Sequence, residues 1–369
     1  MKARPSAKQA AKIVAARMKN RSINSVARSI AEAGIAKFHF DRYMPSAYFQ
    51  SIIGKAKQSG RDVKTYELRT ITHGWHKPAL APHADLVVTS PPYENARTYG
   101  IRSEFVLATG QEWAMQHACM IRCYLTSGIK TIAYVVSGVT RNYEYSLAPE
   151  RLAVACQDLQ MCVRRPLVYK RFGIPGSGGP DYFRADHESI IVVTARGKMQ
   201  WSDVTACGLP PKFPVGGNPS SRKRNGSRVS GRAFKQPAKT NPGSIIDCGA
   251  VGGGHLGHPL AHRNEAPYPV ALPDRFIRSF CPPNGTVFDP FSGSGTTLHA
   301  AMLAGRNGVG FDARQEQTIV ALHRLIDVAN EVVQDNQVVL INADGIIVSI
   351  DKEHGVSTII GGPIPEIPK

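Results

Sequence analysis

The sequence predicts an α/β fold whose largely parallel sheet is covered by helices on both faces. Short apolar strands alternate with helical stretches that carry apolar residues three and four positions apart. The strands are expected at 85–90, 130–138 and 187–195, and the helices at 112–125 and 147–159. Hydrophobic residues make up 42% of the 369-residue chain, enough for a sizeable core. Functional loops are therefore expected at the carboxyl ends of the strands, where such sheets bind ligands.

The same alternation returns in the last third of the chain. The stretch "VFDPFSGSGTT" reads as a strand, a Gly-rich turn and the start of a helix that Gly305 ends. A further strand is expected to end at Asp312, before another helix. The stretch "QVVLINADGIIVSI" predicts a small terminal hairpin that turns at Asp344 and Gly345, to which no function is assigned.

The charge balance points to a polyanionic partner. The chain has 45 Lys and Arg against 28 Asp and Glu, a net charge of +17. A basic surface without a specific partner is the alternative. A membrane partner is not expected, because no apolar run approaches the roughly 20 residues that span a bilayer. The seven cysteines show no paired spacing, so reduced thiols, no metal site and a cytoplasmic location are expected.

Two segments concentrate the positive charge. Residues 1–35 contain a single acid, Glu32, in a helical pattern, and are either a phosphate-contacting arm or a solvated helix packed on the main body. Between Asp203 and Asp247 there is no acid at all, many Gly, Pro and Ser, and eight basic residues: Lys212, Arg222, Lys223, Arg224, Arg228, Arg232, Lys235 and Lys239. An irregular insert that a phosphate backbone orders explains this composition, with a flexible solvated loop as the alternative.

The Gly-rich turn does not match the commonest phosphate loops. No lysine follows Gly295, which excludes a P-loop, and Leu298 stands where a dinucleotide fingerprint has its third glycine. A nucleoside without a pyrophosphate fits better, because Gly293 and Gly295 allow close backbone approach and the helix start offers N–H groups to a carboxylate. Asp312 follows about 20 residues later, the placement of an acid that holds ribose hydroxyls. S-Adenosylmethionine carries both of these groups. The candidate cofactor residues are Asp289, Pro290, Phe291, Gly293, Gly295, Thr296, Thr297 and Asp312.

A rigid corner, "TSPPY", follows the strand at 85–90. Ser90 offers a hydroxyl acceptor, Pro91 a carbonyl at a fixed φ, Pro92 added stiffness and Tyr93 a flat ring. Two converging acceptors can orient an amine, and the ring can stack on the base that carries the amine. Such a base has to leave the duplex and enter the pocket, at a cost of a few kcal/mol. These four residues are the candidate catalytic residues, and a plain turn is the alternative.

Together, "TSPPY" and "DPFSGSGTT" resemble the motifs of the amino-group DNA methyltransferases, which methylate N4 of cytosine or N6 of adenine. The resemblance covers roughly residues 76–330. It implies a doubly wound, Rossmann-like sheet that binds S-adenosylmethionine and ends in a reversed hairpin. The catalytic corner precedes the cofactor turn, which is similar to the circularly permuted β group of the family. The stretch "EAPYPVALPDRFIRSFCPP" resembles the segment that closes the methionine pocket, with Pro267 and Tyr268 in it, and Tyr169 and Lys170 stand where the family often has an aromatic residue and a lysine.

The resemblance also suggests a division of the chain. The expected parts are a basic, partly helical N-terminal region (1–75), a catalytic half (76–205), a basic insert for target recognition (206–260), a cofactor-binding half (261–331) and a C-terminal hairpin (332–369). Within the insert, the candidate DNA-binding residues are Arg222, Lys223, Arg224, Arg228 and Arg232.

The expected function is site-specific methylation of duplex DNA by base flipping. Ser90 favours N4 of cytosine, because the adenine-N6 enzymes usually carry Asp or Asn there. Methylation at C5 of cytosine is excluded, because it needs a cysteine nucleophile directly after a proline, whereas Cys281 is followed by proline. The alternatives are adenine N6, an amine of RNA or protein, and a non-catalytic DNA-binding protein with this fold. The family acts in restriction–modification, but no residue identifies a partner restriction endonuclease.

Overall fold

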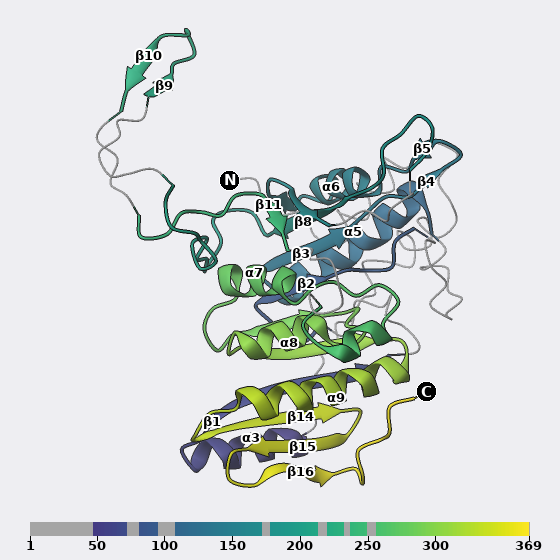
Figure 1. The fold of residues 1–369 in the computed structure, drawn as a ribbon, viewed down its shortest axis with the longest axis vertical. Helices are drawn as coiled ribbons and strands as arrows, with labels where there is room; N and C mark the ends of the chain where they lie inside the picture. Colours follow the sequence, from purple (N-terminus) through teal and green to yellow (C-terminus); the bar gives the residue numbers. More distant parts are fainter. Residues whose placement is uncertain are drawn as a thin grey trace.

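A twelve-stranded, twisted sheet with helices on both faces forms the centre of the computed structural model (Figure 1). The structure describes residues 47–71, 81–94, 108–171, 178–212, 220–231, 237–248 and 256–368. The strand order is β11-β7-β8-β3-β2-β12-β13-β1-β14-β15-β16, and β6 pairs with β8. The expected α/β fold is therefore confirmed.

The strands of this sheet come from every part of the described chain. They are β1 (Asp62–Thr70), β2 (Leu86–Thr89), β3 (Thr131–Val136), β6 (Cys162–Val163), β7 (Leu167–Lys170), β8 (His187–Thr194), β11 (Ile245–Asp247), β12 (Thr286–Asp289), β13 (Asn307–Asp312), β14 (Gln337–Ala343), β15 (Ile346–Asp351) and β16 (Gly355–Ile360). The central strands from β3 to β14 are parallel, whereas β8 runs antiparallel to β3 and β7.

The connections of the sheet diverge between β2 and β12, which are parallel neighbours. From β2 the chain leads through helix α5 (Gly110–Ser127) to β3 on one side. From β12 it leads through helix α8 (Thr296–Leu303) to β13 on the other side. Such a divergence leaves a crevice outside the carboxyl ends of the two strands, where ligands bind in open α/β sheets.

Alternating side chains divide the core between the two faces of the sheet. Along β3, Ala133 and Val135 pack in one cluster with α7 (Ala271–Phe280), α8 and α9 (Gln315–Val332). Ile132, Tyr134 and Val136 pack in another cluster with α5 and α6 (Ala148–Asp158). The helices expected at 112–125 and 147–159 are thus confirmed.

The predicted terminal hairpin is confirmed, and it extends the main sheet. Asp344 and Gly345 have φ values of 48° and 96°, as a two-residue hairpin turn requires. Strand β14 pairs in parallel with β1, and Phe49 of helix α3 (Ala47–Gln58) packs against Val338 and Leu340 of β14.

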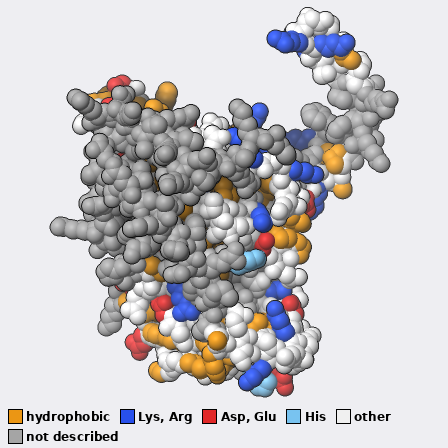
Figure 2. Space-filling model, turned by 180° about the vertical axis from the view of Figure 1, so that it is seen from behind, with side chains coloured by type: hydrophobic (Ala, Val, Ile, Leu, Met, Phe, Trp, Pro, Cys, Tyr) orange, Lys and Arg blue, Asp and Glu red, His pale blue; other side chains and the backbone are white. Residues whose placement is uncertain are grey.

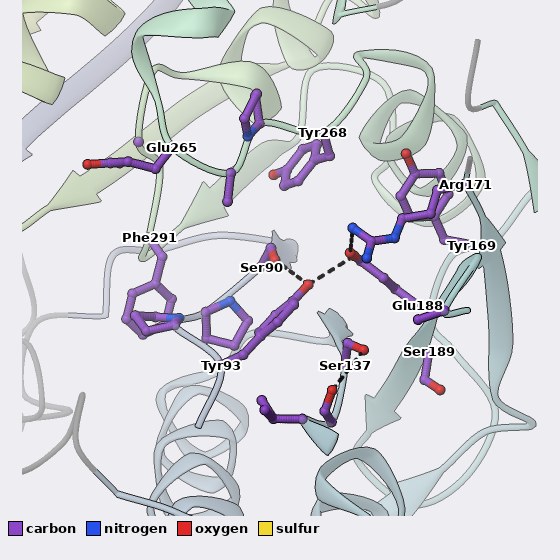
Figure 3. A pocket seen from close by; sticks show the side chains of 18 of the residues that line it. Ser90, Tyr93, Ser137, Tyr169, Arg171, Glu188, Ser189, Glu265, Tyr268 and Phe291 are labelled. Atoms are coloured by element: carbon purple, nitrogen blue, oxygen red, sulfur yellow. Dashed lines mark hydrogen bonds and ion pairs between the residues drawn. The ribbon is translucent and has the colours of Figure 1, made fainter. Parts of the chain in front are cut away.

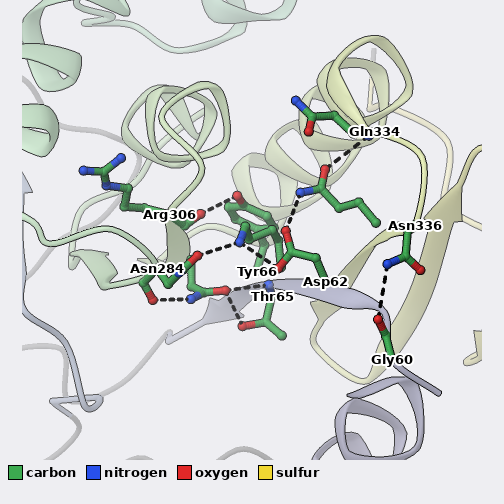
Figure 4. Close-up of polar contacts among 11 residues, drawn as sticks. Gly60, Asp62, Thr65, Tyr66, Asn284, Arg306, Gln334 and Asn336 are labelled. Atoms are coloured by element: carbon green, nitrogen blue, oxygen red, sulfur yellow. Dashed lines mark hydrogen bonds and ion pairs between the residues drawn. The ribbon is translucent and has the colours of Figure 1, made fainter. Parts of the chain in front are cut away.

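The sequence did not indicate strand β1, which lies between β13 and β14. Polar contacts hold its first residues on both sides (Figure 4). The Tyr66 hydroxyl donates to the Arg306 carbonyl at 2.5 Å, and the Gln337 amide donates to Asp62 at 3.0 Å. The helical pattern expected within 1–35 lies outside the described residues.

Because one sheet collects strands from all five predicted parts of the chain, those parts remain a prediction about function and are not separate folding units. The insert also contains a regular element that the sequence did not indicate. Strands β9 (Ser220–Arg222) and β10 (Arg228–Ser230) form an antiparallel hairpin that projects from the body (Figure 1).

Three smaller elements complete the described fold. They are β4 (Thr140–Arg141), β5 (Glu144–Tyr145) and the 3-10 helix η3 (Pro259–Arg263). All seven cysteines are unpaired thiols. Within the described ranges, no helix has the length and apolar character needed to cross a bilayer.

Replacement of Ile341 by Ala tests whether the terminal hairpin is part of the core. Ile341 is 0% exposed between β1 and β15, so Ile341→Ala should lower the free energy of unfolding by about 2–4 kcal/mol. The control is Ile359→Ala on β16, where the side chain is 39% exposed and the loss should stay below about 1 kcal/mol. Urea unfolding measures both, and equal losses would contradict a structural role of β14.

Candidate active site

A cleft of about 1050 Å³ lies at the carboxyl ends of β2 and β12 (Figure 3). It brings together the two motifs that the sequence places far apart. Ten of the predicted residues line it: Ser90, Pro91, Pro92, Tyr93, Pro267, Tyr268, Pro290, Phe291, Gly293 and Asp312. Asp289, Gly295, Thr296 and Thr297 are not among its lining residues.

The corner after β2 is held by more than its two prolines. The Trp113 indole, on the first turn of α5, donates to the Pro92 carbonyl at 3.0 Å. The buried Glu94 carboxylate accepts the Gly110 N–H at the start of α5, at 2.5 Å. Among the described residues, no hydrogen bond reaches the Pro91 carbonyl. Of the two proline carbonyls in this corner, that of Pro91 is therefore the one available to a ligand.

Ser90 and Tyr93 are connected by their hydroxyls. Ser90 Oγ lies 3.0 Å from the Tyr93 hydroxyl, which donates to Glu188 Oε2 at 2.9 Å (Figure 3). Burial, and next the charge of Glu188, raise the pKa of Tyr93 well above its ordinary value. The phenol is therefore neutral and acts as a hydrogen-bond donor as well as a flat surface.

Sequence reasoning missed Glu188 and Arg171. Glu188 is only 9% exposed, and its Oε1 atom forms an ion pair with Arg171 Nη1 at 2.9 Å. The sequence signal that could have indicated Glu188 is an acid at the start of the apolar strand "HESIIVV". It was easily overlooked, because a strand pattern tolerates one polar residue at its end. Of the two nearby residues that the resemblance singled out, Tyr169 lines the cleft, whereas Lys170 pairs with Asp247 at 2.8 Å in an exposed position.

Asp289 ties the two motifs together from below the cleft. Its carboxylate accepts from the Thr89 hydroxyl at 2.6 Å, the Thr297 hydroxyl at 2.5 Å and the Phe291 N–H at 3.0 Å. The Tyr268 hydroxyl lies 3.2 Å from the same carboxylate and also contacts Thr297. Burial raises the pKa of Asp289 to about 6 although these hydrogen bonds act in the opposite direction. Both oxygens of Asp289 thus accept hydrogen bonds from the protein, and its role in cofactor binding stays a prediction.

The Gly-rich turn is anchored to the acid at the end of β13. The Gly293 N–H donates to Asp312 at 2.9 Å, and Arg314 binds Asp312 and, at 2.6 Å, Glu265. Gly293 has a φ of +48°, and a Cβ there would stand 2.5 Å from the Asn264 amide nitrogen, so a larger residue would be strained and would have to displace Asn264. Burial raises the pKa of Asp312, and Arg314 opposes this effect.

The start of α8 faces the protein interior. The fully buried Arg324 of α9 donates to Thr296 Oγ1 at 2.8 Å, to the Ser294 carbonyl at 3.3 Å and to His299 Nδ1 at 3.2 Å. A Cβ on Gly295 would stand 3.0 Å from Cβ of Ala321, so this glycine lets α8 pack on α9. Gly295, Thr296 and Thr297 shape the turn from behind and do not line the cleft.

Four of the five candidate DNA-binding residues lie on the projecting hairpin. Arg222 and Arg228 are directly opposite each other on β9 and β10, and Lys223 and Arg224 lie in the connecting turn. Figure 2 shows these basic side chains at the end of the projection. Arg232 lies outside the described residues. Two arginines directly opposite each other repel, and an anion bound between them would relieve this repulsion.

Replacement of Asp289 by Asn tests the buried carboxylate through its pH dependence. Burial raises its pKa from 3.8 to about 6, so the folded protein holds this proton more tightly than the unfolded chain. Its stabilising contribution is complete below pH 4 and is lost as the pH rises through about 6. The free energy of unfolding of wild type minus Asp289→Asn should fall by about 2.5 kcal/mol between pH 4 and pH 7. Denaturant titrations measure this difference, and a constant value would contradict a raised pKa.

Known proteins resemble the part of the chain that forms the cleft. A family model described as DNA methylase, N6_N4_Mtase, matches residues 84–323, more than half of the chain. The orphan methyltransferase M.BamHII of Bacillus amyloliquefaciens is 27% identical over 248 residues, which are 65% of this chain and 88% of that protein. The type II methyltransferase M.HpaI of Haemophilus parainfluenzae is 23% identical over 246 residues, 65% of this chain and 68% of that protein.

Two solved structures are also similar. The cytosine-N4-specific PvuII DNA methyltransferase has 16% identity and a TM-score of 0.48, with 73% of this chain and 94% of that chain covered. TTHA0409 of Thermus thermophilus, in complex with S-adenosyl-L-methionine, has 20% identity and a TM-score of 0.46, with 76% and 98% covered. On the strength of the family match over residues 84–323, with both motifs in one cleft, the chain belongs to the DNA methylase family and is a DNA methyltransferase of the N4/N6 amino-methylase type.

Proposed function

We propose that the protein transfers a methyl group from S-adenosylmethionine to N4 of cytosine in duplex DNA, after the base has been flipped into the cleft. The observation that carries this proposal is the position of Ser90 and Tyr93 in the same cleft as Tyr268, Gly293 and Asp312. An amine held at the first pair and a nucleoside held at the other three would be next to each other. Proximity of two reactants in a fixed orientation accounts for a large share of such an acceleration.

The residues around the Gly-rich turn fit a nucleoside. Asp312 and Glu265, both in the cleft lining, are carboxylates that suit ribose hydroxyls, and Arg314 holds them side by side. Gly293 brings bare backbone to the cleft, and Phe291 and Tyr268 supply flat rings near it. When bound, S-adenosylmethionine would supply an electrophilic methyl group. The start of α8 is turned inward, so a carboxylate of the ligand would be held elsewhere in the cleft.

The amine would be held by Ser90 and Pro91. Ser90 Oγ and the Pro91 carbonyl are acceptors, and two acceptors can take up both N–H bonds of an exocyclic amine. Orienting both N–H bonds favours the pyramidal nitrogen that attacks a methyl group. Cytosine is preferred over adenine because Ser stands at position 90, where the adenine-N6 enzymes usually have Asp or Asn.

The hairpin of β9 and β10 would contact the DNA. Its twelve described residues, 220–231, include no acid and carry Arg222, Lys223, Arg224 and Arg228. A two-stranded ribbon fits into the major groove, and lysine and arginine neutralise phosphates. The side chains of Arg222 and Arg228 share one face of the ribbon, since cross-strand partners point the same way.

Replacement of Ser90 by Ala tests the catalytic corner. Ser90→Ala should slow transfer of labelled methyl to duplex DNA by roughly 100-fold or more, because one of the two amine acceptors is lost. The affinity for S-adenosylmethionine, measured by calorimetry, should change less than about threefold. Ser137→Ala is the matched control, since within the described part of the chain the hydroxyl of this cleft serine bonds only to the adjacent Gly138 carbonyl. Full activity of Ser90→Ala, or loss of cofactor binding, would contradict the assigned role.

Neutralising the hairpin tests the DNA contact. The triple variant Arg222→Gln, Lys223→Gln and Arg224→Gln should weaken DNA binding and reduce the slope of log K against log salt by about 0.9 per lost phosphate contact. The control replaces the exposed Lys55, Lys57 and Lys352 by Gln, at the end of the molecule with α3 and β16 (Figure 1). Fluorescence anisotropy over a salt series measures both. An unchanged slope in the hairpin variant would remove the hairpin from the DNA interface.

A further inference from the structure

A line of hydrogen-bonding groups leads from the catalytic corner to a buried carboxylate (Figure 3). Ser90 Oγ is 3.0 Å from the Tyr93 hydroxyl, and that hydroxyl is 2.9 Å from Glu188 Oε2. Arg171 Nη1 closes the line at 2.9 Å from Glu188 Oε1. Three separate elements contribute, namely the corner after β2, the start of strand β8 and the residue that follows β7. Nothing in the catalytic roles assigned above uses Glu188 or Arg171.

The direction of these hydrogen bonds follows from the number of hydrogens available. A carboxylate that is ion-paired with Arg171 can only accept, so the single hydrogen of the Tyr93 phenol points to Glu188. Tyr93 then has only lone pairs for Ser90, and Ser90 has to donate its own hydrogen to Tyr93. The remaining lone pairs of Ser90 Oγ are therefore free to accept an N–H bond from the amine.

We propose that Glu188 is the final acceptor of the proton that the amine loses, and that Ser90 and Tyr93 relay it there. This inference rests on the proposed function. As the N–C bond forms, the S–C bond breaks and its electron pair stays on sulfur. The nitrogen gives one proton to Ser90 Oγ, Ser90 passes its own proton to Tyr93, and Tyr93 passes its own to Glu188. Both hydroxyls are restored, the product amine is neutral, and Glu188 has become a carboxylic acid.

The surroundings of Glu188 suit this role. Arg171, which follows β7, forms an ion pair with Glu188, the Tyr93 hydroxyl donates to it, and Tyr169 on β7 is its cross-strand partner. On its own segment, His187 and Asp186 form an exposed pair 3.5 Å apart. Glu188 is only 9% exposed, so its carboxylate is largely shielded from bulk water. The relay is thus a short route from the corner after β2 to a carboxylate in the lining of the same cleft.

Three variants test the relay in single-turnover methylation of duplex DNA. Tyr93→Phe keeps the ring and removes only the hydroxyl, and Glu188→Gln keeps the shape and removes the base. Each should slow methyl transfer by roughly 100-fold, the scale of a lost general base. The double variant should be no slower than either single variant, because both interrupt the same route. The pH dependence of the single-turnover rate should differ between wild type and Glu188→Gln, because only the wild-type relay ends in a carboxylate.

A wild-type rate in Tyr93→Phe, or losses that multiply in the double variant, would overturn the relay. Wild-type protein is assayed first: if it methylates no DNA, the proposed function fails and the relay is not what has failed. Base flipping, followed by 2-aminopurine fluorescence, should be unchanged in both single variants.

A second readout needs no cofactor. Tyrosine labelled with ¹³C at Cζ reports the titration of Tyr93 by NMR, with Tyr93→Phe to assign its signal. The charge of Glu188 raises the pKa of Tyr93, so this pKa should fall in Glu188→Gln. An unchanged pKa would show that the phenol does not contact the carboxylate and would overturn the relay.

Discussion

The site depends on one buried carboxylate at the point where the sheet connections diverge. Asp289 ends β12, and its oxygens accept hydrogen bonds from Thr89 at the end of β2 and from Thr297 in α8. Thr89 immediately precedes Ser90, so the same carboxylate fixes the catalytic corner relative to the Gly-rich turn. A buried polar group of this kind is costly unless it is fully bonded, and here each bond joins a different element. The Asp289 carboxylate thus fixes the end of β2 relative to the Gly-rich turn, and ligands can bind in the cleft above it.

Much of this fold follows from patterns that are local in the sequence. The strands β2, β3, β8 and β12 are apolar runs bounded by turn residues, and α5 and α6 have the helical period, so each was predictable. Strand β1 was not, because Lys64 and Glu67 on its two faces, only 8% and 6% exposed, make it look like a polar segment. Polar partners such as Asn284, which accepts from Lys64 at 2.7 Å, make that burial acceptable, and they lie far away in the sequence.

The same limit applies to the site. The two motifs, and the cleft residues within them, could be recognised because each is contiguous. The difference between lining and supporting residues could not, because the inward turn of Thr296 and Thr297 depends on Arg324 and Asp289. Glu188 and Arg171 belong to no motif, and their relation to Tyr93 appears only when β7 and β8 are paired next to β3. The position of Arg222 opposite Arg228 in the projecting hairpin likewise could not be predicted, because it depends on how β9 and β10 pair.

The central claim is methyl transfer to N4 of cytosine in DNA. The most direct measurement incubates the purified protein with duplex DNA and S-adenosylmethionine carrying a labelled methyl group, then digests the DNA to nucleosides and identifies the labelled one by mass spectrometry. The account predicts label in N4-methylcytosine and none in 5-methylcytosine. Label in N6-methyladenine would contradict the assignment of the base by Ser90, and label in RNA alone, or in no nucleoside, would contradict the proposed function.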